Sequence, residues 1–250
     1  MEMKKIVCLA LAVFMMLSLC ACGAKKDALV VGITDFEPMD YKNDKGEWIG
    51  FDADMAKEFA KFLGKEVEFV EIDWDNKIME LDAGTIDCVW NGMTLTDEVK
   101  KGMECGNPYC NNAQVVVIPA DKAAAYQDEA SLKALVFAVE AGSAGEDAVQ
   151  ALGNKYNAVA TQADALMEVA AGTSDACVID LLMAGAMIGE GTSYPHLTYT
   201  VKLTTEEYGV GFKKGSGMAE KYNEFYAKAF AEGKVAEIAK VYGVQESIIG

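Results

Sequence analysis

Short apolar runs alternate with amphipathic stretches along the chain from residue 29 onward. Leu29–Thr34, Val67–Ile72 and Gln114–Pro119 have the length and composition of buried strands. Between two of them, residues 51–63 place large apolar side chains at helical spacing, and Gly64 ends the predicted helix. Strands that alternate with amphipathic helices are typical of α/β proteins, so we predict an α/β fold with mostly parallel sheets.

Two junctions of the chain resemble each other, Ala83–Trp90 and Ala171–Asp180. In each, a predicted helix ends at glycine, a polar turn follows, and a short apolar strand begins. Chance similarity is the alternative, because glycine is common at helix ends. The repetition favours two α/β lobes side by side. Since open α/β sheets bind ligands outside the carboxyl ends of their strands, Asn91, Gly92 and Asp180 are expected to face one cleft.

The net charge of the chain is −17 at pH 7, and the sequence contains no arginine. Such a charge repels nucleic acid phosphates and anionic lipids, which excludes nucleic acid as a partner. The acidic surface could attract cationic solutes or could simply keep the protein soluble.

The cysteines and the single histidine give no metal or nucleophilic site. His196 has no Cys-x-x-Cys pairs near it, and a lone histidine in a proline-containing loop weakens any triad scheme. We therefore predict no metal and no cofactor. Cys88 and Cys177 lie in apolar runs typical of a core, whereas Cys105 and Cys110 lie in a turn-rich stretch and either form a disulfide or stay free.

The amino terminus has the pattern of an export signal. Two lysines precede the apolar run Ile6–Leu19, which is too short to span a bilayer and has the length of a secretory signal. The run ends in a sequence that resembles a bacterial lipobox, with Cys22 as the cysteine that would carry lipid. Cys22 fits better than Cys20 because the small residue Ala21 precedes it.

We predict that residues 1–21 are a lipoprotein signal peptide and that residues 22–28 form a tether. The mature protein would be extracytoplasmic and anchored to the cell membrane by lipid on Cys22, since two or more acyl chains anchor stably. An ordinary signal peptide or a weak membrane helix is the alternative.

Five further segments resemble one protein family. They are Val30-Val31-Gly32, Gly50-Phe51-Asp52-Ala53-Asp54-Met55-Ala56, Asn91-Gly92-Met93-Thr94-Leu95-Thr96-Asp97-Glu98, Gly142-Ser143 and Tyr208-Gly209-Val210-Gly211-Phe212. Together they resemble the polar amino-acid branch of the bacterial extracellular solute-binding proteins that feed ABC importers. The resemblance extends from about Leu29 to Tyr242.

This resemblance implies a two-lobe periplasmic-binding-protein-like fold of type II, with the ligand cleft between lobes that close by a hinge. Residues 29–116 and 208–250 would form lobe 1, and residues 117–207 would form lobe 2. The two hinge crossings would fall near Gln114–Pro119 and Lys202–Phe212.

The resemblance also implies roles for individual residues. Phe36 and Trp74 would be aromatic walls of the site, although either could be a core residue. Asn91, Gly92 and Thr94 would offer donors to a ligand carboxylate, although a tight turn needs glycine for backbone reasons alone.

Asp180 would accept hydrogen bonds from the α-ammonium of a ligand, with a helix cap as the alternative. Glu140 and Ser143 would lie in the ligand-facing loop of lobe 2, and Asp35 would lie near the cleft with Glu37.

One position departs from the family pattern. The arginine that clamps the ligand carboxylate in the family corresponds to Val99, and a shift of one residue would offer Lys100. Ala144 also lacks a hydroxyl that many relatives use. With Asp35, Glu37, Glu140 and Asp180 near the cleft, the site is acidic. The pattern favours a ligand with positive charge, or one without a free carboxylate, over a neutral amino acid.

The sequence therefore predicts a lipid-anchored, monomeric solute-binding component of an ABC importer, which is not an enzyme. It would capture a small amino-acid-like or cationic nitrogen compound and hand it to a membrane permease. One alternative is an enzyme on the same scaffold, resembling cyclohexadienyl dehydratase, in which Glu140 would be the general acid. Another is a sensory receptor with the same ligand site.

Overall fold

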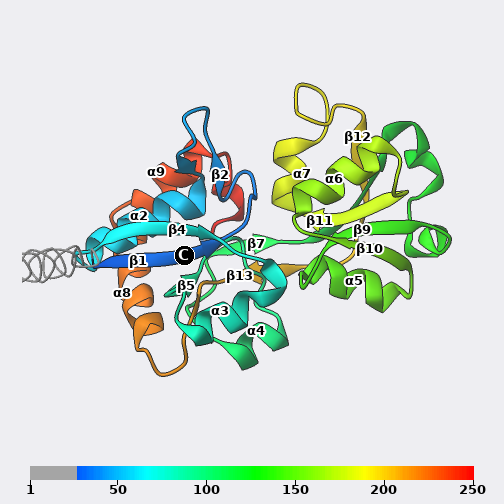
Figure 1. Cartoon of the computed structure of the whole chain (residues 1–250). Helices are drawn as coiled ribbons and strands as arrows, with labels where there is room; N and C mark the ends of the chain where they lie inside the picture. The colour runs from blue at the N-terminus through cyan, green and yellow to red at the C-terminus, as the bar shows by residue number, and fades with distance from the viewer. Residues whose placement is uncertain (1–26) are drawn as a thin grey trace, which may run out of the picture.

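Two five-stranded sheets organise residues 27–250, which are the residues that the computed structural model describes (Figure 1). The predicted signal peptide and Cys22 lie outside these residues. Within them, no helix has the length and apolar character needed to cross a membrane. Each sheet forms one lobe, as predicted.

Lobe 1 is built on a sheet with the strand order β4-β1-β5-β14-β6. Its strands are β1 (Ala28–Ile33), β4 (Glu66–Glu71), β5 (Cys88–Val89), β6 (Glu104–Cys105) and β14 (Gly211–Phe212), and a small hairpin, β2 (Tyr41–Lys42) and β3 (Trp48–Ile49), lies apart from the sheet. The strand β1 pairs in parallel with β4 and β5, so that Val31 lies opposite Phe69 and Cys88.

Helices from both ends of the chain cover this sheet. They are α2 (Phe51–Phe62), η1 (Trp74–Asn76), α3 (Lys77–Ala83), α4 (Asp97–Gly102), α8 (Met218–Ala231), α9 (Lys234–Val241) and η4 (Gln245–Ser247). Phe59 on α2 is central to the core, because its ring lies 5.2–6.2 Å, between centroids, from those of Trp90, Phe212, Tyr222 and Phe225. The carboxyl-terminal helices thus return to lobe 1.

Lobe 2 has the strand order β10-β9-β11-β8-β12. Its elements are β8 (Gln114–Pro119), η2 (Ala120–Ala125), η3 (Glu129–Leu132), β9 (Val136–Glu140), α5 (Ala144–Leu152), β10 (Lys155–Val159), α6 (Gln162–Ala171), β11 (Ala176–Asp180), α7 (Leu181–Met187) and β12 (Leu197–Lys202). The strands β9, β10 and β11 are parallel, whereas β8 runs antiparallel to β11.

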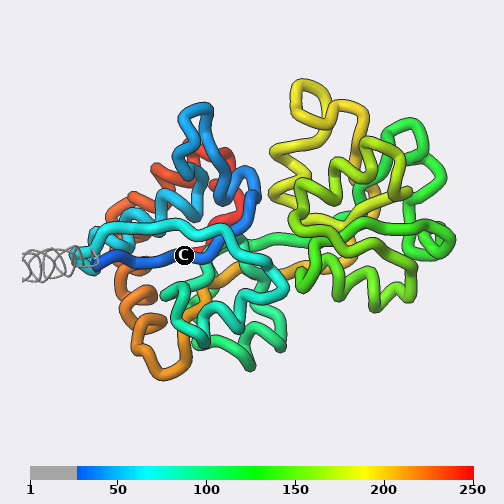
Figure 2. The backbone as a smooth tube through the Cα atoms, in the orientation of Figure 1, coloured from blue at the N-terminus to red at the C-terminus, as the bar shows by residue number. Residues whose placement is uncertain are grey.

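Two short strands join the lobes. β7 (Cys110–Asn112) and β13 (Glu206–Tyr208) pair antiparallel with Asn112 opposite Glu206, and they carry the chain between the lobes (Figures 1 and 2). The strands next to them, β8 and β14, enter their sheets in the direction opposite to the parallel strands. Each sheet is therefore parallel along one side and antiparallel on the side where the crossings enter. The residue limits of the lobes stay a prediction, and β8 belongs to the lobe 2 sheet from Gln114 onward.

The repeated junction of the sequence is a repeated structure. Gly84 ends α3 and Gly172 ends α6, with left-handed φ angles of 76° and 75°. In each copy the next threonine hydroxyl donates to the carbonyl of the glutamate five residues earlier, at 2.9 Å in lobe 1 and 3.0 Å in lobe 2. A positive φ favours glycine, which explains why both turns begin with this residue.

The disulfide that the sequence left open is not formed, because both Cys105 and Cys110 are free thiols. Cys105 lies on β6 opposite Gly211, whereas Cys110 lies on β7 opposite Tyr208. Cys88 and Cys177 are buried, as expected for core residues.

Candidate ligand-binding site

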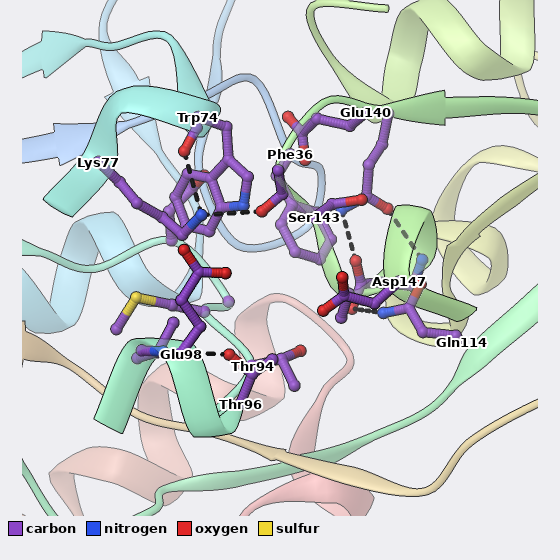
Figure 3. A pocket seen from close by; sticks show the side chains of 18 residues that line it. Phe36, Trp74, Lys77, Thr94, Thr96, Glu98, Gln114, Glu140, Ser143 and Asp147 are labelled. Atoms are coloured by element: carbon purple, nitrogen blue, oxygen red, sulfur yellow. Dashed lines mark hydrogen bonds between the residues drawn. The ribbon is translucent and has the colours of Figure 1, made fainter. Parts of the chain in front are cut away.

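A pocket lies where η1, α4 and the end of β5 in lobe 1 face the ends of β9 and β11 in lobe 2 (Figure 3). About 490 Å³ of space lies between its atoms, part of it open to solvent. Most residues predicted for the site line this pocket, namely Phe36, Trp74, Asn91, Gly92, Thr94, Glu140, Ser143 and Asp180. Asp35 does not line it and instead borders a separate hollow with Glu37.

The side chains reach the pocket because of where the strands end. Asn91 follows shortly after β5, Glu140 is the last residue of β9, and Asp180 is the last residue of β11. The carboxyl ends of strands from two sheets therefore meet across the cleft, as the repeated junction predicted.

Phe36 and Trp74 form apolar walls and are both almost fully buried. Phe36 packs against the strand-to-helix turn so closely that a Cβ at Gly92 would lie 2.4 Å from its ring. Gly92 also has a φ of +53°. A close contact and a left-handed backbone thus both require glycine at this turn.

The hydrogen-bond donors of this turn are bonded to other groups of the protein. The Gly92 N–H donates to Asp52 Oδ2 at 2.6 Å. The Asn91 side-chain amide donates to Thr34 O at 3.0 Å and to Asp40 Oδ2 at 2.8 Å. In this conformation Asn91 and Gly92 shape the turn, which was the structural alternative for Gly92.

Burial raises the pKa of Asp52, which accepts the Gly92 bond, to about 7. Burial and the charge of Asp52 also raise the pKa of Asp40. Thr94 is bound within the protein as well, because its hydroxyl donates to Glu206 Oε1 at 2.8 Å.

Asp180 is the most extensively bonded acid of the pocket. Its carboxylate accepts hydrogen bonds from Gln114 Nε2 at 3.0 Å and from the Tyr208 hydroxyl at 2.7 Å, and also from Asn112 and Gln162. Burial, followed by the negative charge of nearby Glu206, raises its pKa to about 8. Its side chain makes no cap bond to α7, so the helix-cap alternative is not realised.

Glu140 contrasts with Asp180, because one oxygen of its buried carboxyl group has no hydrogen-bond partner among the residues that the structure describes. The residue is 3% exposed, and this oxygen is Oε1. Burial, followed by the negative charge of Asp180, raises the pKa of Glu140 to about 8, although the charge of Lys77 and the neighbouring side chains of Thr34 and Gln162 act in the opposite direction.

Sequence reasoning missed Lys77, which also lines the pocket. Its ammonium donates to the carbonyl oxygens of Gly142 at 2.8 Å and Trp74 at 3.2 Å, and burial lowers its pKa. A signal was present in the sequence, because Lys77 follows the aromatic wall Trp74 by three residues at a helix start and so shares its face. Lys100, the residue considered instead, is exposed and borders another hollow.

Val99 lies where the resemblance placed it. It lines the pocket, is buried, and packs in the cluster that contains Trp74 and Leu81. Two acids that the sequence did not single out also line the pocket, Glu98 from α4 and Asp147 from α5.

A polar pocket between two α/β lobes that paired strands connect defines a two-lobe solute-binding protein. The chain belongs to the bacterial extracellular solute-binding proteins, family 3, because the model of this family matches residues 29–245. Membership of this family places the protein outside the cytoplasm.

Individual relatives agree with this assignment. The chain is 29% identical to a probable histidine-binding protein of Neisseria gonorrhoeae, over 93% of this chain and 97% of that protein. It is 26% identical to the arginine-binding extracellular protein ArtP of Bacillus subtilis, over 95% and 97%. Among solved structures, it is similar to the ancestral amino acid-binding protein AncCDT-1, a precursor of cyclohexadienyl dehydratase, with a TM-score of 0.79, 29% identity, and coverage of 86% and 95%.

Proposed function

We propose that the protein is the solute-binding component of an ABC importer and that it captures an amino-acid-like ligand with positive charge. Its family membership and its amino-acid-binding relatives support the transport role. We infer the positive charge of the ligand from the pocket itself. The observation behind this inference is the buried Glu140 carboxyl group.

A buried carboxyl oxygen without a hydrogen-bond partner is costly, and a buried carboxylate without a compensating charge is more so. Glu140 Oε1 is such an atom among the described residues, and it lies in the wall of the pocket. An ammonium, guanidinium or imidazolium group of a ligand would supply both a donor and a compensating charge. The aromatic wall Phe36 is suited to the same kind of group, because cations are attracted to aromatic faces, whereas the ring of Trp74 lies against the Lys77 ammonium.

The charge of the whole lining agrees with this proposal. Within the part of the chain that the structure describes, Glu98, Glu140, Asp147 and Asp180 oppose a single basic residue, Lys77. Burial raises the pKa of Glu140 and of Asp180 to about 8, and a bound cation would favour their ionised forms, whereas an anion would oppose them. We expect ordinary neutral amino acids to bind less tightly than basic ones.

A thermal-shift screen followed by calorimetry tests this proposal. The ligands are basic amino acids, diamines, and the neutral amino acids alanine and glutamine, since a ligand that binds only the folded state raises the melting temperature. Glu140→Gln should weaken the binding of the best cationic ligand by about tenfold or more. Glu68→Gln, the same change at an exposed residue of β4, is the matched control. Tighter binding of alanine or glutamine than of every cationic ligand would overturn the proposal.

The enzyme alternative assigns Glu140 a different role, that of a general acid. The named relatives are binding proteins, which supports binding over catalysis. A ligand that calorimetry shows to bind should therefore be recovered unchanged by mass spectrometry after prolonged incubation.

The lipid anchor at Cys22 is part of the same proposal and rests on the sequence from Leu19 to Gly23. Mass spectrometry of the native protein should find a mature amino terminus at a lipid-modified Cys22. An unmodified Cys22, or a terminus at another residue, would remove the anchor while leaving the binding proposal intact.

A further inference from the structure

We infer that Lys77 is a specificity residue, which binds the carboxylate of the ligand and so selects a cationic amino acid over the corresponding amine. The inference rests on the proposed function and names the class of ligand more narrowly. It depends on the position of Lys77, on what its ammonium contacts, and on what the neighbouring acids contact.

The ammonium group of Lys77 is held inside the pocket. Lys77 begins α3 and is 6% exposed, and its Nζ lies 5.1 Å from the centroid of the Trp74 ring. An ammonium has three N–H donors. Two of them point to the carbonyl oxygens of Trp74 and Gly142, which leaves one N–H for a ligand.

Lys77 has no carboxylate partner within residues 27–250, although four acids line the same pocket. All ion pairs among residues 27–250 involve other lysines. The two groups that accept hydrogen bonds from Lys77 are neutral backbone carbonyls. A buried charge is stabilised when an opposite charge is in contact with it. A ligand carboxylate at Lys77 would provide this contact.

The nearby acids form no ion pair with Lys77 in the described part of the chain, although the charges of Glu98 and Glu140 act on its ammonium and oppose the lowering of its pKa by burial. Asp180 accepts its hydrogen bonds from amide and hydroxyl donors, such as Gln114 and Tyr208. Glu140 Oε1 contacts no donor of the described chain, Lys77 included. No carboxylate of the described residues is therefore in direct contact with Lys77, and a ligand that carries both charges would contact Lys77 and Glu140 at once.

Lobe 2 places a hydroxyl group close to the contact of Lys77. Gly142, which accepts the Lys77 bond, precedes Ser143, and Ser143 is the N-cap of the nine-residue helix α5. The Ser143 hydroxyl accepts from Glu146 N at 3.1 Å, and no described residue accepts its proton. The first turn of α5 carries Glu146 and Asp147, and Glu146 Oε2 accepts from Gly142 N at 2.6 Å. The Ser143 hydroxyl is therefore the group of this helix start that is left for a carboxylate at Lys77.

These features define a ligand with a carboxylate at Lys77 and positive charge toward Glu140. A basic amino acid carries both groups, whereas a diamine carries only the positive charge. Lys77 would act as a single point charge, in a chain that has no arginine to form a bidentate clamp.

Pairs of ligands that differ only in the carboxylate test the inference. They are arginine and agmatine, lysine and cadaverine, and histidine and histamine. Calorimetry on the purified protein should show that the amino acid of the best-binding pair binds at least about tenfold more tightly than its amine. Lys77→Met should abolish this preference by weakening the amino acid and leaving the amine within about threefold.

Two further variants show whether the change in affinity is specific to the charge of Lys77. Lys100→Met removes the same charge from an exposed residue outside the pocket and should change neither affinity. Lys77→Arg keeps a cation and should retain the preference, which keeps the test valid if Lys77→Met does not fold.

Three outcomes would overturn the inference. In the first, the wild-type protein binds the amine as tightly as the amino acid. In the second, Lys77→Met weakens the binding of the amine and of the amino acid equally, which would leave Lys77 only the role of holding the lobes together. Both results leave cation binding, and so the proposed function, in place. Binding of none of these six compounds would remove the proposed function together with the inference.

Discussion

Lys77 Nζ donates a hydrogen bond of 2.8 Å to the carbonyl oxygen of Gly142, and this bond joins lobe 1 to lobe 2 across the ligand pocket. The same residue lines the pocket that the ligand would enter. Lobe closure and ligand contact therefore share one side chain. A change that prevents the two lobes from meeting at Gly142 should also weaken the binding of ligand.

The first prediction concerns this contact. Gly142 has a φ of +69°, and a Cβ there would lie 2.7 Å from the Cα of Asp75 in lobe 1. Gly142→Ala should therefore hold the lobes apart and weaken ligand binding by at least about tenfold in calorimetry, as expected when roughly 1.4 kcal/mol of binding free energy is lost.

Gly153→Ala is the matched control for that variant. Gly153 also has a positive φ, +75°, but a Cβ added at this position would have no described atom within 4 Å beyond its immediate chain neighbours. Both variants should lose roughly 1–2 kcal/mol of stability from backbone strain, and only Gly142→Ala should lose affinity. Equal affinities would show that the Gly142 contact does not contribute to closure.

A second prediction concerns pH and stability. The pKa values of Glu140 and Asp180 rise to about 8 in the folded protein, from ordinary values of 4.5 and 3.8. Because both groups hold their protons more tightly in the folded than in the unfolded chain, the free energy of unfolding should fall as the pH rises from about 4 to 8. Urea unfolding across this range should show the fall, and Glu140→Gln should make it shallower. A free energy of unfolding that rises with pH in both proteins would contradict the assignment.

The same groups predict a pH dependence of ligand binding. A cationic ligand favours the ionised carboxylates, so it should bind more tightly as the pH rises from about 6 to about 8 and should release protons on binding near pH 7. Calorimetry in buffers with different ionisation enthalpies measures this release. Proton uptake would indicate that the pocket acids are not the cation partners.

A third prediction concerns Asp180. Asp180→Asn should weaken the binding of an ammonium-bearing ligand by roughly 1.5–3 kcal/mol, the size of a charge-assisted hydrogen bond. It should also reduce the stability of the fold, because the side-chain amide would face the donors Gln114 and Tyr208, whose hydrogen bonds the carboxylate now accepts. Urea unfolding and calorimetry separate the two effects. Unchanged affinity in a folded variant would place the ammonium site elsewhere.

A fourth prediction uses the aromatic wall. Trp74 lines the pocket, whereas Trp90 is buried in the lobe 1 core and Trp48 lies on the β2–β3 hairpin. Ligand binding should change tryptophan fluorescence, and Trp74→Phe should remove most of this change. Trp48→Phe is the control and should leave it intact. Trp74→Ala should in addition weaken binding, because stacking and buried apolar area are lost.

The local structure of this protein follows from its sequence alone. Alternating apolar runs and helical spacing predicted the α/β lobes, since periodicity decides which face of an element is buried. The glycines at Gly84 and Gly172 predicted two equivalent helix ends, because few other residues adopt a positive φ there. Strand ends, together with the family resemblance, also predicted most of the pocket lining, including Glu140 and Asp180.

Which polar groups are left for a ligand depends instead on how the elements pack in three dimensions. The sequence could not show that the Gly92 N–H is bound by Asp52, or that Asp35 borders a different hollow. It also did not single out Lys77, whose partner Gly142 is 65 residues away and in the other lobe. Hydrogen bonds and buried charges depend on distances of a few ångströms between elements, and such distances are fixed by how the two lobes pack rather than by local periodicity.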